Sequence, residues 1–234
     1  CTIAPGSAVY LYFMMGLPTE TDEDLAGIAS LALRIKDLYH EIRGKYDCRV
    51  TVSVSSFVPK PFTPFQWMPQ CSVAEIERKQ QYLKDLFRDK HIKYAYHDAK
   101  TGYLEAVLAR GDRQLGKVIL KAWKKGCTYD SWTEFFNYDK WIECFHECNI
   151  DPDLYANRPR NEFEQEPWDH IDCGVTKDYL RKEWKMAQKG LLTHDCRHLP
   201  CNGCAVCPLL DVKLIDHKAV SYTHLRAHET KANL

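Results

Sequence analysis

YFMMGLPTETDED, residues 12–24, decides the fold class of this chain. The apolar run that enters this stretch stops at Gly16 and Pro18, a pattern typical of a strand buried on both faces in a parallel sheet. Thr21 is followed three residues later by Asp24, the spacing of a capping box that begins a helix. Ligands of α/β proteins bind at such strand-to-helix turns, so this turn is the first candidate for a site.

The stretches on either side continue an alternation of strand and helix, which predicts a βαβ arrangement with a parallel sheet. Apolar spacing, capping residues and closing glycines set the limits of each element. The expected order is a strand over 8–15, a helix over 21–44, a strand over 49–57, a helix beginning at 72 and a strand over 92–97.

Beyond Asp98 the pattern changes to helices with an apolar stripe, expected near 102–108, 113–124, 131–147 and 176–189. The proline-rich stretch 149–172 reads as a long connection. We therefore expect an α/β segment over 1–98, a helical extension over 99–190 and a cysteine-rich segment over 191–216. Residues 217–234 have no apolar periodicity, and we interpret them as an artefactual or unstructured tail.

Composition excludes several classes of protein. Lys plus Arg equals Asp plus Glu at 32 each, so the net charge is zero, which argues against a nucleic-acid partner. The longest apolar run is far shorter than the roughly 20 residues of a membrane span, and no secretory signal precedes it. We expect a cytoplasmic protein without a membrane partner. Because the sequence starts at Cys1 inside apolar sequence, we interpret it as a fragment.

The chain has 11 cysteines, an odd number in a sequence with ordinary core composition, which argues against a disulfide framework. Cys196, Cys201, Cys204 and Cys207 form a C-x4-C-x2-C-x2-C pattern, which indicates a metal site. The spacing leaves three alternatives open: an iron–sulfur cluster, zinc, or thiols that bind no metal or serve redox chemistry. Three further residues are alternative ligands: Cys173, His194 and His198.

Two strings carry a resemblance to a known superfamily. YFMMGLPTETDED at 12–24 and VSVSSFVPKPFTPFQW at 52–67 resemble the fifth and sixth strands of the radical S-adenosylmethionine (radical SAM) core, as in methylthiotransferases. Three later strings, LEAVLARGDRQLGKVI, GCTYDSW and PWDHIDCGVTKDYL, together with the terminal cysteines, resemble an uncharacterised subfamily with a cobalamin-binding domain. The resemblance implies the carboxyl-terminal part of a partial (β/α)6 TIM-like barrel, followed by a mostly helical extension with a cysteine-rich end.

In this superfamily the ends of these two strands lie against the adenine of S-adenosylmethionine. Carried over to this chain, the resemblance implies cofactor contacts from Met14, Met15, Gly16, Leu17, Ser56, Phe57 and Val58. The chain contains no CxxxCxxC motif, so the ligands of the catalytic 4Fe-4S cluster are absent from it, and no catalytic residue is assigned. The stretch 2–5 resembles an earlier strand end of the family, which suggests an internal deletion near 5–10.

The resemblance implies that the parent enzyme generates a deoxyadenosyl radical and modifies an unknown substrate. The fragment itself is expected to be inactive. The implied partners and cofactors are an electron donor such as flavodoxin or ferredoxin, a second iron–sulfur cluster or zinc at the terminal cysteines, and cobalamin in an upstream domain. The alternative function is a non-catalytic, cysteine-rich, zinc-binding interaction module.

Overall fold

The computed structural model describes residues 8–45 and 47–213, and these form two compact units. The first unit contains the described residues up to Pro61 together with Gln66–Pro167. The second contains Phe62–Phe65 and the described residues from Trp168 onward. The expected deletion near 5–10 lies partly, and the expected tail over 217–234 wholly, outside the described residues.

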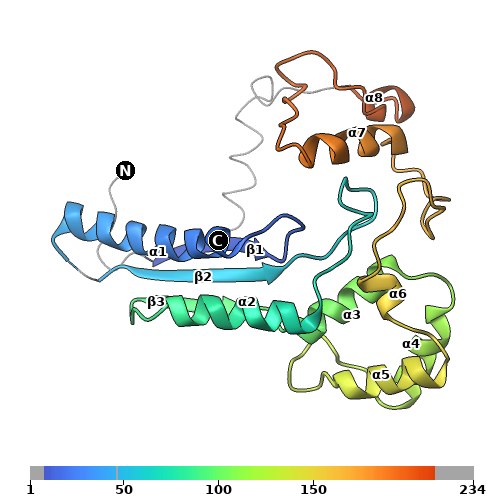
Figure 1. The fold of residues 1–234 in the computed structure, drawn as a ribbon, viewed down its shortest axis with the longest axis horizontal. Helices are drawn as coiled ribbons and strands as arrows, with labels where there is room; N and C mark the ends of the chain where they lie inside the picture. Colours follow the sequence, from blue (N-terminus) through green and yellow to red (C-terminus); the bar gives the residue numbers. More distant parts are fainter. Residues whose placement is uncertain (1–7, 46, 214–234) are drawn as a thin grey trace, which may run out of the picture. The chain divides into compact units, whose positions relative to one another are not determined.

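A three-stranded parallel sheet forms the framework of the first unit (Figure 1). Its strands are β1 (Ala8–Met15), β2 (Arg49–Ser56) and β3 (Ile92–Tyr96), in that order across the sheet. Each crossover is a helix, α1 (Asp22–Arg43) and then α2 (Val73–Leu86). The predicted βαβ alternation is therefore confirmed for these elements.

Local capping sets the limits of α1. Thr21 and Asp24 make the reciprocal capping box, and Gly44 closes the helix in the left-handed conformation with φ 66°. The Ser72 hydroxyl in turn accepts a hydrogen bond from the Glu75 backbone N–H at the start of α2. These caps satisfy backbone groups that a helix end leaves unpaired.

Both crossover helices cover the same face of the sheet. Val50, Val52 and Val54 of β2 are fully buried and share one core with Leu25 of α1 and Leu83 of α2. Helices α1 and α2 also contact each other. A run of sequential parallel strands with right-handed crossovers places its helices on one side in this way.

The opposite face of the sheet is open, which corrects the expectation of a strand buried on both faces. Tyr10 and Tyr12 of β1 are 62% and 78% exposed, whereas Leu11 and Phe13, which alternate with them, pack on the core. Because tyrosine and leucine are both apolar in a sequence pattern, the alternation of exposed and buried residues along β1 cannot be recognised from the sequence.

The expected partial TIM-like barrel is also wrong. Barrel closure requires each strand to pair on both edges. Within residues 8–45 and 47–213, β1 and β3 each pair only with β2, and the strands form an open three-stranded sheet. The fold class is α/β with eight helices among the described residues.

Four further helices of the first unit enclose a second hydrophobic core. Val107 of α3, Val118 of α4 and Phe145 of α5 are buried in it. The helix expected over 131–147 is shorter than predicted, because residues 131–135 form turns and Asn137 caps α5. The four helices are α3 (Ala99–Arg110), α4 (Leu115–Lys124), α5 (Tyr138–Glu147) and α6 (Asp153–Ala156).

The second unit contains α7 (Lys177–Ala187) and the short α8 (Val206–Leu209). The rings of Phe65 and Trp184 meet edge to face at 5.7 Å, which joins the separate stretch 62–65 to α7. Across the helices of the described part of the chain, none combines the length and the apolar character that crossing a bilayer requires.

Candidate functional site

Gly16 forms the turn at the carboxyl end of β1, and its geometry excludes a side chain. Its φ is 84°, in the left-handed region that favours glycine. A Cβ atom at this position would lie 2.8 Å from Cδ1 of Ile76 on α2. The Gly16 carbonyl accepts a 3.5 Å hydrogen bond from the Cys71 thiol. The turn is therefore packed tightly against the start of α2.

A buried ion pair lies beneath this turn. The Glu20 carboxylate accepts the Gly16 backbone N–H at 3.0 Å with both oxygens and lies 2.6 Å from the Lys79 ammonium. The Glu20 and Lys79 side chains are only 5% and 6% exposed. The pair ties the strand-to-helix turn to α2, and it holds the Glu20 carboxylate in one orientation.

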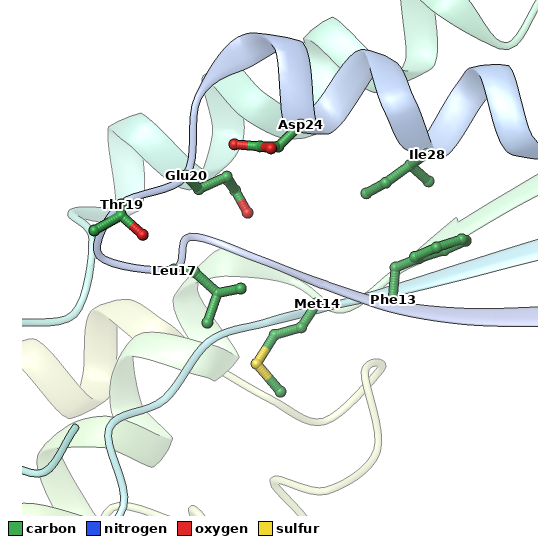
Figure 2. Close-up of a pocket in the computed structure, with 7 residues that line it drawn as sticks. All are labelled: Phe13, Met14, Leu17, Thr19, Glu20, Asp24 and Ile28. Carbon is green, nitrogen blue, oxygen red and sulfur yellow. The ribbon is translucent and has the colours of Figure 1, made fainter. Parts of the chain in front are cut away.

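A pocket of about 310 Å³ opens beside the turn, between β1 and the start of α1. Figure 2 shows Phe13, Met14 and Leu17 along the strand end and Glu20 and Asp24 on the turn and helix that face them. Met14 is 46% and Leu17 is 37% exposed, so both present apolar surface to solvent. The complete lining is Phe13, Met14, Leu17, Thr19, Glu20, Asp24 and Ile28.

The acidic residues that line the pocket are already hydrogen-bonded. Asp24 accepts from the backbone N–H and the hydroxyl of Thr21, both at 2.8 Å. The backbone hydrogen bond from Thr21 is the main cause that lowers the pKa of Asp24. Glu20 and Asp24 therefore contribute fixed acceptors beside an apolar floor, a combination typical of pockets for flat, partly polar ligands.

The structure separates the candidate residues at the end of β1. Met14 and Leu17 line the pocket, whereas Met15 is fully buried in the core under the sheet. Gly16 is buried as well and supplies only backbone groups. Sequence reasoning missed Thr19 of the turn and Ile28 of α1, which line the pocket, and Lys79 of α2, which pairs with Glu20.

The candidates at the end of β2 do not line this pocket. The Phe57 backbone N–H donates to the Met15 carbonyl at 2.7 Å, which extends the strand pairing. Phe57 and Val58 are buried, and Val58 packs in the helical core. The Ser56 hydroxyl is buried and has no hydrogen-bond partner among the described residues. The end of β2 packs against α3, where Gly102 lies against Ser56.

The four terminal cysteines lie in the second unit around α8. Cys201 is exposed, and Cys196, Cys204 and Cys207 are half-buried. Backbone contacts fix part of the loop, since the Thr176 N–H donates to the Cys204 carbonyl at 3.3 Å. No group of three or more His, Cys, Asp or Glu side chains is arranged to hold a metal ion in residues 8–45 and 47–213. The metal site therefore stays a prediction from the cysteine spacing.

Comparison with known proteins finds a distant relative. An uncharacterised protein of Methanocaldococcus jannaschii is 33% identical over 111 residues, which cover 47% of this chain and 23% of that protein. The match thus spans about a quarter of the relative's length. No family model matches the chain, and no solved structure matches it.

Proposed function

We propose that this chain is part of a radical SAM enzyme and that the pocket beside Gly16 binds the adenine of S-adenosylmethionine. The observation that supports the proposal most directly is the pocket itself. It lies at the carboxyl end of a parallel strand, where α/β proteins bind their ligands. It also adjoins Met14, Gly16 and Leu17, at which the superfamily resemblance places the adenine contacts.

The chemistry of the pocket fits an adenine ring. The side chains of Met14 and Leu17 offer apolar contact for the flat faces of the base. The Glu20 carboxylate and the Thr19 hydroxyl offer acceptors for its exocyclic amine. Because Glu20 is held by the Gly16 N–H and by Lys79, it would need little reorganisation on binding.

The residues of this chain bind and orient the nucleoside in this proposal. This sequence has no CxxxCxxC motif, so none of its residues is assigned to the 4Fe-4S cluster that would supply the electron for cleavage of the cofactor. The whole protein would then act in the cytoplasm, receive its electron from flavodoxin or ferredoxin and modify a substrate outside this pocket. Cobalamin in an upstream domain belongs to the same proposal.

Equilibrium dialysis with S-adenosylmethionine tests the pocket on the chain as it exists. We expect saturable binding that Leu17→Glu weakens at least about tenfold, because a carboxylate then meets the apolar face of the base. Leu86→Glu is the matched control, since Leu86 is also 37% exposed but lies at the end of α2 outside the pocket. Equal binding by both variants, or no saturation, would contradict the proposal.

A second candidate function rests on the spacing of the four terminal cysteines. CxxC spacing suits the thiolate ligands of zinc or of an iron–sulfur cluster. We propose that these cysteines bind one of the two metals, with zinc indicating a non-catalytic interaction module. Metal analysis of the anaerobically purified chain distinguishes iron from zinc. The variant Cys204→Ser should lose the metal, while Cys48→Ser, which alters a buried core thiol, should retain it.

A further inference from the structure

A second, larger hollow lies at the opposite end of the sheet, where the parallel strands begin. Its volume is about 850 Å³. The residues that line it come from the start of all three strands and from the loops before β2 and β3. They are Ala8, Tyr10, Asp47, Arg49, Val50, Thr51, Lys90, His91 and Lys93. None of them belongs to the pocket beside Gly16.

Strand register places several of these side chains together on the open face of the sheet. Tyr10 pairs with Thr51, and Thr51 pairs with Lys93, so the three lie in one row across the strands. Arg49 stands two residues before Thr51 and points to the same face. Strands lie about 4.8 Å apart, so the row spans about 10 Å.

The lining carries an excess of positive charge. Arg49, Lys90 and Lys93 face a single carboxylate, Asp47. All three cations are exposed, and none forms an ion pair with a residue that the structure describes. Like charges gathered in a hollow raise the local potential and attract anions, even though the chain as a whole is neutral.

Asp89, the carboxylate next to the lining in the sequence, is engaged with a cation outside the hollow. Asp89, beside Lys90, is paired with Lys36 of α1 and accepts the His91 backbone N–H at 2.8 Å. Asp47 interacts with the Tyr39 hydroxyl. Burial is the main cause that raises the pKa of Tyr39, and the interaction with Asp47 raises it further. Within the part of the chain that the structure describes, the three cations of the lining therefore outnumber its single carboxylate, and the hollow keeps a net positive charge.

We propose that this hollow binds an oligophosphate, an anion whose charge is spread over several phosphate groups. The guanidinium of Arg49 and the ammonium of Lys93 suit phosphate oxygens, and the hydroxyls of Thr51 and Tyr10, in the same row as Lys93, add neutral donors. The volume exceeds what one phosphate needs. Arg49 and Lys93 come from two strands and Lys90 from the turn before β3, so a single phosphate would meet only part of the charge.

Isothermal titration with inorganic tripolyphosphate tests the site on the full chain in about 50 mM chloride, where exposed charges are weakly screened. We expect saturable binding and much weaker binding of orthophosphate and sulfate. Arg49→Gln and Lys93→Gln should each weaken binding about tenfold, the loss expected for a hydrogen bond between charged groups. Arg49→Lys, which keeps the charge, should lose less.

Lys84→Gln is the matched control, because Lys84 is an exposed lysine on α2 outside the hollow and its loss changes the net charge equally. Circular dichroism should show that every variant keeps its fold, since all of these side chains are exposed. The proposal is overturned if tripolyphosphate does not saturate, if Lys84→Gln weakens binding as much as Lys93→Gln, or if S-adenosylmethionine displaces tripolyphosphate.

Discussion

Replacement of Gly16 by alanine should destabilise the first unit strongly. The left-handed conformation, with φ 84°, costs an alanine about 1–2 kcal/mol. The new Cβ would lie 2.8 Å from Cδ1 of Ile76, and relieving such an overlap in a packed region costs about 1–3 kcal/mol. Alanine also restricts the unfolded chain more than glycine does, which offsets about 0.5–1 kcal/mol of this loss. We expect a net loss of about 2–4 kcal/mol in the free energy of unfolding.

Gly44 provides the control for the backbone contribution. It also has a left-handed φ, 66°, but a Cβ added there would meet no atom of the described residues within 4 Å. Gly44→Ala should therefore cost only about 1 kcal/mol. Urea unfolding followed by far-ultraviolet circular dichroism gives both values from one protocol.

Ile76→Val removes the methyl group that the new Cβ would meet and so isolates the steric contribution. Ile76 is buried, and the single change should cost about 0.5–1.5 kcal/mol. In the Ile76→Val background, Gly16→Ala should cost about 1–2 kcal/mol less than in the parent chain, a coupling that a double-mutant cycle measures. Equal costs for Gly16→Ala and Gly44→Ala, or no coupling to Ile76, would refute the close approach of the turn to α2.

Three further predictions concern the same unit. Lys79→Met should cost about 3–5 kcal/mol by urea unfolding, because it leaves the Glu20 carboxylate buried without its partner, and adding Glu20→Gln should restore part of the loss. The hydrogen bond with Lys125 is the main cause that lowers the pKa of Glu147 from its ordinary 4.5 to about 2. The ionised Glu147 carboxylate therefore stabilises the fold fully above pH 4.5, and this contribution is lost as the pH falls through about 2. The melting temperature of Glu147→Gln should therefore be lower than that of the parent chain at pH 6, and the difference should disappear as the pH falls through that range. Ser56→Ala should leave the melting temperature unchanged or raise it, because it removes a buried hydroxyl without a described partner, and a clear decrease would reveal a missing contact.

Local signals in the sequence predicted the elements around the site well. The spacing of Thr21 and Asp24 predicted the start of α1, and both reciprocal hydrogen bonds are present. Gly44 ends the same helix as expected. Such features depend on residues within one helical turn, so a single sequence contains the information they need.

Long-range contacts could not be predicted in the same way. Glu20 and Lys79 are 59 residues apart, and no local pattern in the sequence relates residues at that separation. The open face of β1 was missed because Tyr10 and Tyr12 count as apolar while they stand exposed. The expected barrel failed for a related reason, since no local pattern reports how many strands join a sheet.

The start of α5 shows a local signal that was available and overlooked. Asn137 caps the helix, with its side chain accepting the Lys140 backbone N–H at 3.0 Å. Asparagine is among the preferred N-cap residues, whereas the apolar spacing before it suggested an earlier start. Capping residues were here a better guide to the helix limit than apolar periodicity.

Methionine-methyl NMR tests the central claim, the adenine pocket beside Gly16, most directly. The chain has four methionines, of which Met14 lines the pocket and Met68 belongs to the same unit outside the pocket. On titration with S-adenosylmethionine, we predict a saturable shift of the Met14 methyl signal, assigned by Met14→Leu, from the ring current of the adenine. The signal of Met68, which belongs to the same unit and does not line the pocket, should shift much less. An unchanged Met14 signal at saturating cofactor, or an equal shift of Met68, would contradict the adenine pocket beside Gly16.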